Sequence, residues 1–243
     1  MWTRRELKKR AKVRFKANYW KCVVVAFILL LVSGGLSAAA NGKNAKNAKD
    51  TADSFEAESV EDVIAEIQEI ASQPEFAAAI RVTRTVSLVM TALSLLVFGP
   101  LQVGCQSFYL KNATGAGDLN DLERGFKPSW LRNVISMFLT SLFLALWFLL
   151  FLIPGIIKTY SYRLVPYILA DDPNVDALDA ITRSRKMMRG HKWDAFVLDL
   201  SFLGWGILTI LTAGLLGYFY VFPYKDATDA ELYLAIKSQN TNL

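Results

Sequence analysis

Long apolar segments, separated by shorter charged ones, dominate the pattern of this chain. Four of them, residues 20–40, 86–110, 134–157 and 195–224, reach the length of roughly 20 helical residues that crosses the hydrocarbon core of a bilayer. The first contains Lys21 near its start and the last contains Asp199, whereas the two in the middle carry no charge. None shows the strict alternation of a membrane β-barrel strand. The pattern predicts an all-α, polytopic membrane protein.

Composition agrees with this prediction. Hydrophobic residues make up 53% of the 243 positions, and the mean hydropathy of +0.28 is high for a soluble domain. Ala38-Ala39-Ala40 resembles a signal-peptide cleavage site, but the basic region before it extends to Lys21, which favours an uncleaved first span. Cys22 and Cys105 lie inside apolar segments, so they give no disulfide framework.

The N-terminus has the pattern of a basic amphipathic helix over residues 1–19. Thr3 and Glu6 have the spacing of a capping box. An apolar residue then recurs at every fourth position, at Leu7, Ala11, Phe15 and Tyr19. Cationic residues surround this stripe, among them Arg4, Arg5, Lys8 and Lys9. We expect the helix to lie on an anionic leaflet and lead into the span 20–40; lipid recognition or nucleic-acid binding is the weaker interpretation.

A polar insert, residues 41–85, separates the first two spans. Its first ten residues contain little apolar surface, and a second capping box then begins at Ser59 with Asp62. Apolar residues at helical spacing follow, so we predict an amphipathic helix whose acidic face is solvated. Residues 111–133, between the next two spans, contain neither a phosphate-binding nor a calcium-binding loop pattern.

Residues 173–192 predict another amphipathic helix at the membrane surface. Asp172 is suited to cap it and Pro173 to occupy its first position. Acidic residues come early and basic residues late, which complements the helix dipole. The late basic residues are Arg183, Arg185, Lys186 and Arg189.

The turn at Pro154-Gly155 decides how the chain is threaded. Lys and Arg are enriched in cytoplasmic loops, and residues 1–21 contain nine of them, so the N-terminus is predicted inside. If residues 155–170 form a returning helix that ends at Asp171-Asp172-Pro173, eighteen of these cations lie inside and five outside. Without the return, the division is thirteen to ten. The returning helix is therefore favoured.

The last apolar block is long enough for two crossings, with a turn at residues 212–214. About six spans result, with both termini cytoplasmic: residues 20–40, 86–110, 134–153, 155–170, 195–212 and 214–236, followed by a tail, 237–243. The sixth is the weakest, because its inner half contains four charges, at Lys225, Asp226, Asp229 and Glu231.

Arg163 and Asp199 are the charged residues predicted to lie inside the membrane, and they are the candidates for a functional site. Each lies about 10 Å from the cytoplasmic surface in this threading, on different helices, and an unpaired charge there costs several kcal/mol. We hypothesise that they pair. A structural ion pair is favoured over a polar site or proton-coupled gate. His191 is the one histidine, so no metal site, cofactor site or catalytic triad is predicted.

Several segments resemble a bacterial integral-membrane family, the domain of unknown function 975. They include MWTRRELKKRAK, DLERGFKPSWLR, IPGIIKTYSYRLVPYILADDP and ALDAITRSRKMMRGHKWDAF. The third block is also similar to one in the membrane domain associated with glycerophosphoryl diester phosphodiesterases, but no catalytic residues of that activity accompany it. The resemblance implies a multi-pass plasma-membrane protein of bacteria with no established activity.

The sequence therefore favours a non-enzymatic scaffold, regulator or envelope-homeostasis factor. A small transporter or permease component with a polar site in its last three spans is the alternative, and an intramembrane lipid-modifying enzyme is a third. The expected partners are the bilayer, anionic lipids at the cytoplasmic face, and further copies of the chain or other membrane proteins. Nucleic acid is not an expected partner, because the basic runs contain few aromatic residues away from the membrane edges.

Overall fold

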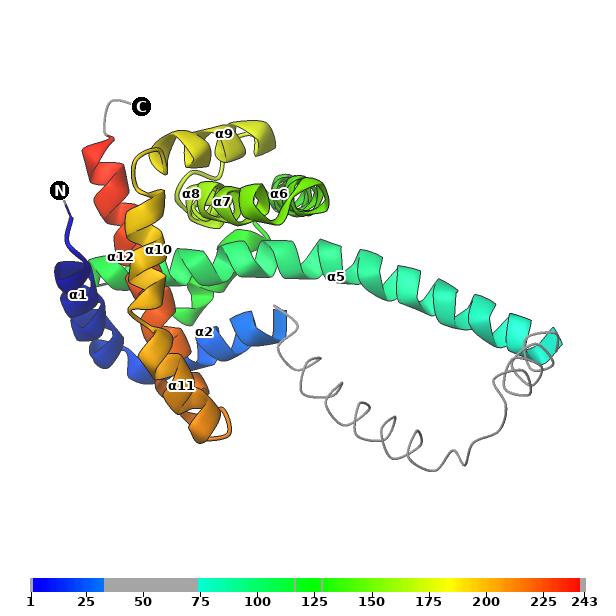
Figure 1. The fold of residues 1–243 in the computed structure, drawn as a ribbon, viewed down its shortest axis with the longest axis horizontal. Helices are drawn as coiled ribbons and strands as arrows, with labels where there is room; N and C mark the ends of the chain where they lie inside the picture. Colours follow the sequence, from blue (N-terminus) through cyan, green and yellow to red (C-terminus); the bar gives the residue numbers. More distant parts are fainter. Residues whose placement is uncertain (1, 33–73, 116, 128, 241–243) are drawn as a thin grey trace. The chain divides into compact units, whose positions relative to one another are not determined.

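The described part of the chain is built of helices and has no strand (Figure 1). In this computed structural model the described residues are 2–32, 74–115, 117–127 and 129–240. The all-α prediction is confirmed. Parts of the predicted segments 20–40 and 41–85 lie outside the described residues. These parts include the candidate cleavage site at 38–40 and the capping box at Ser59.

The chain divides into two compact units, and one of them carries the candidate site. The smaller unit covers residues 33–96, of which the structure describes the helical stretch 74–96. This stretch is the beginning of helix α5 (Pro74–Thr114). The larger unit covers residues 1–32 and 97–243. Besides the end of α5 it contains α1 (Arg4–Ala17), α2 (Tyr19–Val32), the 3₁₀ helix η1 (Leu119–Gly125), α6 (Trp130–Leu150), α7 (Leu152–Tyr162), α8 (Val165–Asp171), α9 (Ala177–Met187), α10 (Lys192–Leu200), α11 (Leu203–Leu211), the π-helical η2 (Gly217–Val221) and α12 (Phe222–Gln239).

Helix α1 begins as its sequence predicts, with the Thr3 hydroxyl accepting a hydrogen bond from the Glu6 amide at 3.3 Å. Its apolar stripe, however, does not lie on a leaflet. Leu7, Ala11 and Phe15 are fully buried in the protein, and α1 packs along α12 (Figure 1). An apolar stripe can pack equally well on a lipid surface or on the apolar face of another helix. The sequence pattern alone therefore could not show that this stripe packs on α12.

Helix α12 is a buried helix of the larger unit. Eleven of its residues are buried, and it contacts α1, α2 and η2. It corresponds to most of the predicted span 214–236, whose charges seemed out of place in lipid. In the structure those charges meet partners: Arg10 of α1, for example, donates to Glu231 at 2.8 Å. The helix is polar because protein, not hydrocarbon, surrounds it.

Helices α6 and α7 form a tight antiparallel hairpin. The chain reverses at Phe151, an extended residue between the two helices, and not at Pro154-Gly155, which lie inside the first turn of α7. Pro154 suits that turn because its missing N–H needs no partner there. At Gly155, an added Cβ would lie 2.5 Å from the Phe148 ring, so glycine lets the two helices approach closely.

The predicted single helix over 155–170 is interrupted. Helix α7 ends at Tyr162 and α8 begins at Val165, with Arg163 and Leu164 between them. Pro166 explains the break, since a continuous helix would force its ring against the carbonyl of the residue four positions earlier, Tyr162. Because of this break, Arg163 sits at a helix junction.

The helix predicted over 173–192 starts later than expected. Helix α9 begins at Ala177 with Asp176 at its N-cap position, and the residues before it form a turn. Asp172 accepts a hydrogen bond from the Asn174 amide in that turn, at 3.0 Å, instead of capping the helix. Pro173 accepts a hydrogen bond from Arg132 through its carbonyl, at 2.5 Å.

Two helical stretches of the described chain are long and apolar enough to cross a membrane: Trp130–Leu150, and Lys192–Leu211, which combines α10 and α11. A shorter apolar helix covers Tyr19–Leu30. After α11 the chain reverses at Ala213 and Gly214, both of which have positive φ angles. Six spans are therefore not confirmed, since the described residues contain two candidates. The predicted fourth span is broken and the predicted sixth is largely polar and buried, while part of the predicted first span lies outside the described residues.

Candidate functional site

A closed network of two cations and two carboxylates lies in the larger unit. Arg163 contacts Asp199 at 2.7 Å and Asp229 at 2.6 Å. Lys225 contacts the same two carboxylates, at 3.4 and 3.1 Å. Each cation therefore touches both anions, and the four charges balance. The Tyr160 hydroxyl adds a hydrogen bond to Asp199 at 3.1 Å.

The network joins three elements that are distant in sequence. Arg163 comes from the junction between α7 and α8, Asp199 from α10, and Lys225 and Asp229 from successive turns of α12. The guanidinium donates to both oxygens of Asp199, at 2.7 and 2.9 Å, in the two-pronged geometry that favours arginine over lysine. Removing one member would leave a charge unpaired among buried groups, which is costly.

A pocket of about 650 Å³ opens beside the network. Six helices contribute to it, namely α5, α6, α7, α8, α10 and α12, and its lining contains both polar and apolar side chains. The polar residues are Gln102, Gln106, Thr140, Ser141, Thr159, Tyr160, Tyr162, Arg163, Tyr167, Asp199, Lys225, Asp226 and Asp229. The apolar residues include Met137, Leu144, Phe148 and Ile156. Such a lining can hold a small molecule with one polar end.

The structure brings together the two residues on which the sequence hypothesis rested, Arg163 and Asp199. It adds Lys225 and Asp229, which the sequence interpretation had treated as charges that weaken a span. Their spacing of four residues places them on one helix face, and this was an available signal. The sequence alone did not indicate that this face of α12 is directed toward Arg163 and Asp199.

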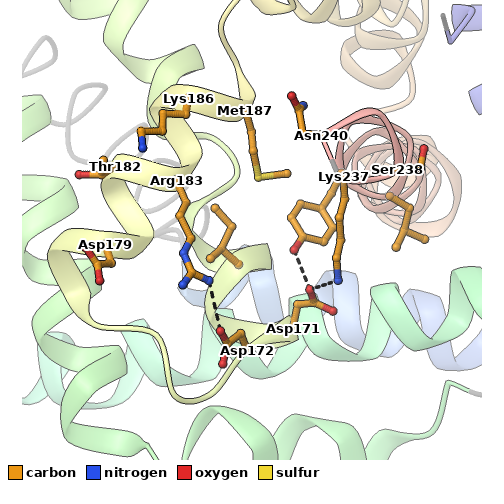
Figure 2. Close-up of a pocket in the computed structure, with 13 residues that line it drawn as sticks. Asp171, Asp172, Asp179, Thr182, Arg183, Lys186, Met187, Lys237, Ser238 and Asn240 are labelled. Atoms are coloured by element: carbon orange, nitrogen blue, oxygen red, sulfur yellow. Dashed lines mark hydrogen bonds and ion pairs between the residues drawn. The ribbon is translucent and has the colours of Figure 1, made fainter. Parts of the chain in front are cut away.

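A second pocket, of about 870 Å³, lies between α8, α9 and the end of α12 (Figure 2). It includes two of the residues at which the returning helix was predicted to end, Asp171 and Asp172. Asp171 accepts hydrogen bonds from Lys237 and, at 2.9 Å, from the Tyr233 hydroxyl. Asp172 pairs with Arg183 at 3.2 Å. The two acids thus tie α8 to α12 and to α9, as the dashed lines in Figure 2 show.

The predicted membrane-surface cations are mostly exposed. Those on α1 and near α9 with exposed side chains are Arg4, Arg5, Lys9, Arg183, Arg185, Lys186 and Arg189. Lys8 is an exception, since it donates to the Ser201 carbonyl at 3.1 Å and lies 4.0 Å from the centre of the Phe202 ring. Trp2 contacts His191, with ring centroids 6.1 Å apart. The start of α1 and the residues after α9 therefore lie next to each other.

A separate ion pair links the start of α2 to η1. Lys21 donates to Asp118 at 2.8 Å, and this hydrogen bond, together with the one from the Leu119 amide, holds the pKa of the Asp118 carboxyl below its usual value. Asp118 also caps η1 through a reciprocal bond with Asp121. Asp118 lies in the segment that joins α5 to α6, outside the apolar helices.

Comparison with known proteins identifies the segment that holds the network. Residues 128–240 match the family described as protein of unknown function (DUF975). No curated protein and no solved structure matches the chain. The matched segment begins before α6 and ends after α12, so it contains all four members of the network. Over residues 128–240, the chain is thus similar to the DUF975 family.

Proposed function

We propose that this protein is a multi-pass helical protein of the bacterial plasma membrane, in which the DUF975 segment acts as a non-enzymatic scaffold or regulator. Its large exposed apolar surface supports the membrane assignment, because soluble proteins seldom expose large contiguous apolar patches. The exposure is greatest where the two hairpins turn: Leu149 is 83% exposed, Ile153 72% and Ile210 80%. These side chains would be in hydrocarbon.

The contact between Trp2 and His191 carries the proposed threading. If the N-terminus is cytoplasmic, the residues after α9 must be at the same membrane surface. The hydrogen bond from Lys8 to Ser201 supports the same arrangement. Trp20 and Trp193 are 70% and 71% exposed, as expected for rings in the headgroup region. Helices α6 and α7 would then cross and return, and the exposed cations would face anionic lipids.

The ion network supports a structural role for the charges inside the protein. A catalytic site needs charged groups that are available to a substrate, whereas these four are engaged with one another. We propose that they hold α10 and α12 against the α7–α8 junction, so that the DUF975 segment presents a fixed surface to its partners.

Extraction of isolated membranes at alkaline pH tests this proposal. The protein should stay in the pellet with integral membrane proteins, as should a variant with two exposed cations of α1 removed, Arg4→Gln with Arg5→Gln. Release of the wild-type chain into the supernatant would contradict a multi-pass protein. Release of the variant alone would mean that surface charge, not insertion, holds the chain.

A transporter or permease component is the second candidate, favoured by the pocket beside the network. Ser141 lines this pocket and is exposed, so a cysteine there reports access from water. In a Ser141→Cys variant, labelling from one membrane side only supports a fixed scaffold. Labelling from either side, with each side protected by the same solute, would favour transport.

A further inference from the structure

The pocket beside the ion network contains one carboxylate more than the network uses. Arg163 and Lys225 balance Asp199 and Asp229, but Asp226 also lines the pocket. Its carboxylate has no ion pair and no hydrogen bond with any other described residue. Because the two cations already contact two carboxylates each, the Asp226 carboxyl is left over as an acceptor.

A second acceptor without a partner lines the same pocket from another helix. Gln106 of α5 is only 6% exposed, and its Oε1 atom is buried without a hydrogen-bond partner. Buried polar atoms are nearly always hydrogen-bonded, so an orphaned one needs a reason. An acceptor of this kind calls for a donor that the rest of the described chain does not provide.

These two acceptors select the charge of a ligand, and the apolar lining residues select its shape. A carboxylate and an amide oxygen together match an ammonium group, which donates up to three hydrogen bonds. The apolar lining residues include Phe148 and Ile156, which are 43% and 45% exposed. An alkyl chain attached to the ammonium would cover these apolar side chains.

We propose that this pocket binds an amphiphilic amine, with Asp226 as the ionic partner of the ammonium group and Gln106 Oε1 as a second acceptor. Arg163 and Lys225 repel the ligand only weakly, because both are neutralised within the network. The site goes beyond the scaffold role, and it requires neither transport nor the proposed threading.

Binding of hexylammonium to the purified full-length protein in detergent tests the proposal. Hexanol, of equal chain length but neutral, separates recognition of the ammonium from partition into micelles. We expect saturable binding of hexylammonium, seen by calorimetry and as a rise in the melting temperature, and none for hexanol. Equal binding of hexanol, or no saturable binding of either, would overturn the proposal.

Variants test the two acceptors separately. Asp226→Asn should weaken hexylammonium binding about tenfold or more and Gln106→Leu about threefold, as expected for a charged and a neutral hydrogen-bond acceptor. Asp179→Asn, the same chemical change in the other pocket, should bind like wild type. Near-ultraviolet circular dichroism checks whether each variant is folded. If Asp226→Asn does not fold, the binding affinity of Gln106→Leu tests the site. Wild-type affinity in every folded pocket variant would refute the site.

Discussion

Arg163 is the residue on which the ion network depends, because it comes from the α7–α8 junction, whereas Lys225 and Asp229 are neighbours on α12. Its side chain is 13% exposed, as is that of Asp229, while Asp199 is 27% exposed. Charges at such positions have given up much of their hydration, and the partner compensates for it. The network therefore connects helices only while all of its members are present.

We predict that Arg163→Met lowers the free energy of unfolding by about 3–5 kcal/mol, the range for breaking a buried pair from one side. The measurement is reversible unfolding of the detergent-solubilised protein. Lys127→Met, in a pair that is 82% and 71% exposed, is the control and should change stability by less than about 1 kcal/mol. A loss for Arg163→Met no larger than the control would show that the network does not hold the helices together.

The Asp118–Lys21 pair predicts a pH dependence. Because the pKa of Asp118 is lowered in the folded protein, its contribution to stability is complete above the unfolded pKa of about 3.9 and is lost as the pH falls through the lower, folded value. Asp118→Asn should therefore melt below wild type at pH 7, with the difference shrinking as the pH falls below about 4. The effect will be small, because the pair is exposed. A difference independent of pH would contradict it.

At the scale of elements, two helix contacts give the fold its hairpins and its core: α6 with α7, and α1 with α12. Gly155 tests the first. We predict that Gly155→Ala destabilises by about 1–3 kcal/mol, because its methyl group would meet the Phe148 ring. Gly204→Ala is the matched control in α11: nothing lies within 4 Å of an added Cβ, so it should be neutral or stabilising. Equal effects of the two changes would mean that the hairpin is not closely packed.

Phe15 tests the second contact and separates it from the leaflet interpretation. The Phe15 ring lies 6.3 Å from that of Tyr224 and is fully buried. Phe15→Ala should therefore cost about 3–5 kcal/mol in detergent, where no leaflet is present. Val13→Ala, on the exposed side of α1, is the control and should change little. If Phe15 instead lay on lipid, both variants would unfold like wild type.

Local patterns in the sequence predicted much at this scale, while the partners of each helix face were harder to predict. The start of α1 and the reversal near Gly214 were predictable because each depends on residues close together in the sequence. The first depends on the capping residue Thr3, and the second on a glycine that can adopt a positive φ angle. The break between α7 and α8 at Arg163 was not predicted, although Pro166 indicates a helix break at this position. The stripe of Leu7 and the charges of α12 were assigned to lipid because periodicity identifies a face but not what covers it. The candidate site combined both cases: Arg163 and Asp199 were predicted to pair, whereas Lys225 and Asp229 were not recognised as members of the same network.

For the whole molecule, the threading determines which surfaces reach the cytoplasm. The contact between Trp2 and His191 joins the two basic helices at their ends, and in the proposed threading the hairpin of α6 and α7 would return the chain to the side from which it came. If α6 crossed without a return, the two basic helices would be separated by the membrane and could not touch. One topological measurement therefore tests the account as a whole.

The measurement is labelling of single-cysteine positions in intact cells with a membrane-impermeant maleimide. Arg189 is exposed after α9, and Lys46, in the predicted external insert, provides the positive control. Cys22 and Cys105 are buried and give little background. We predict that Lys46→Cys is labelled in intact cells, whereas Arg189→Cys is labelled only after permeabilisation. Labelling of Arg189→Cys in intact cells would contradict it.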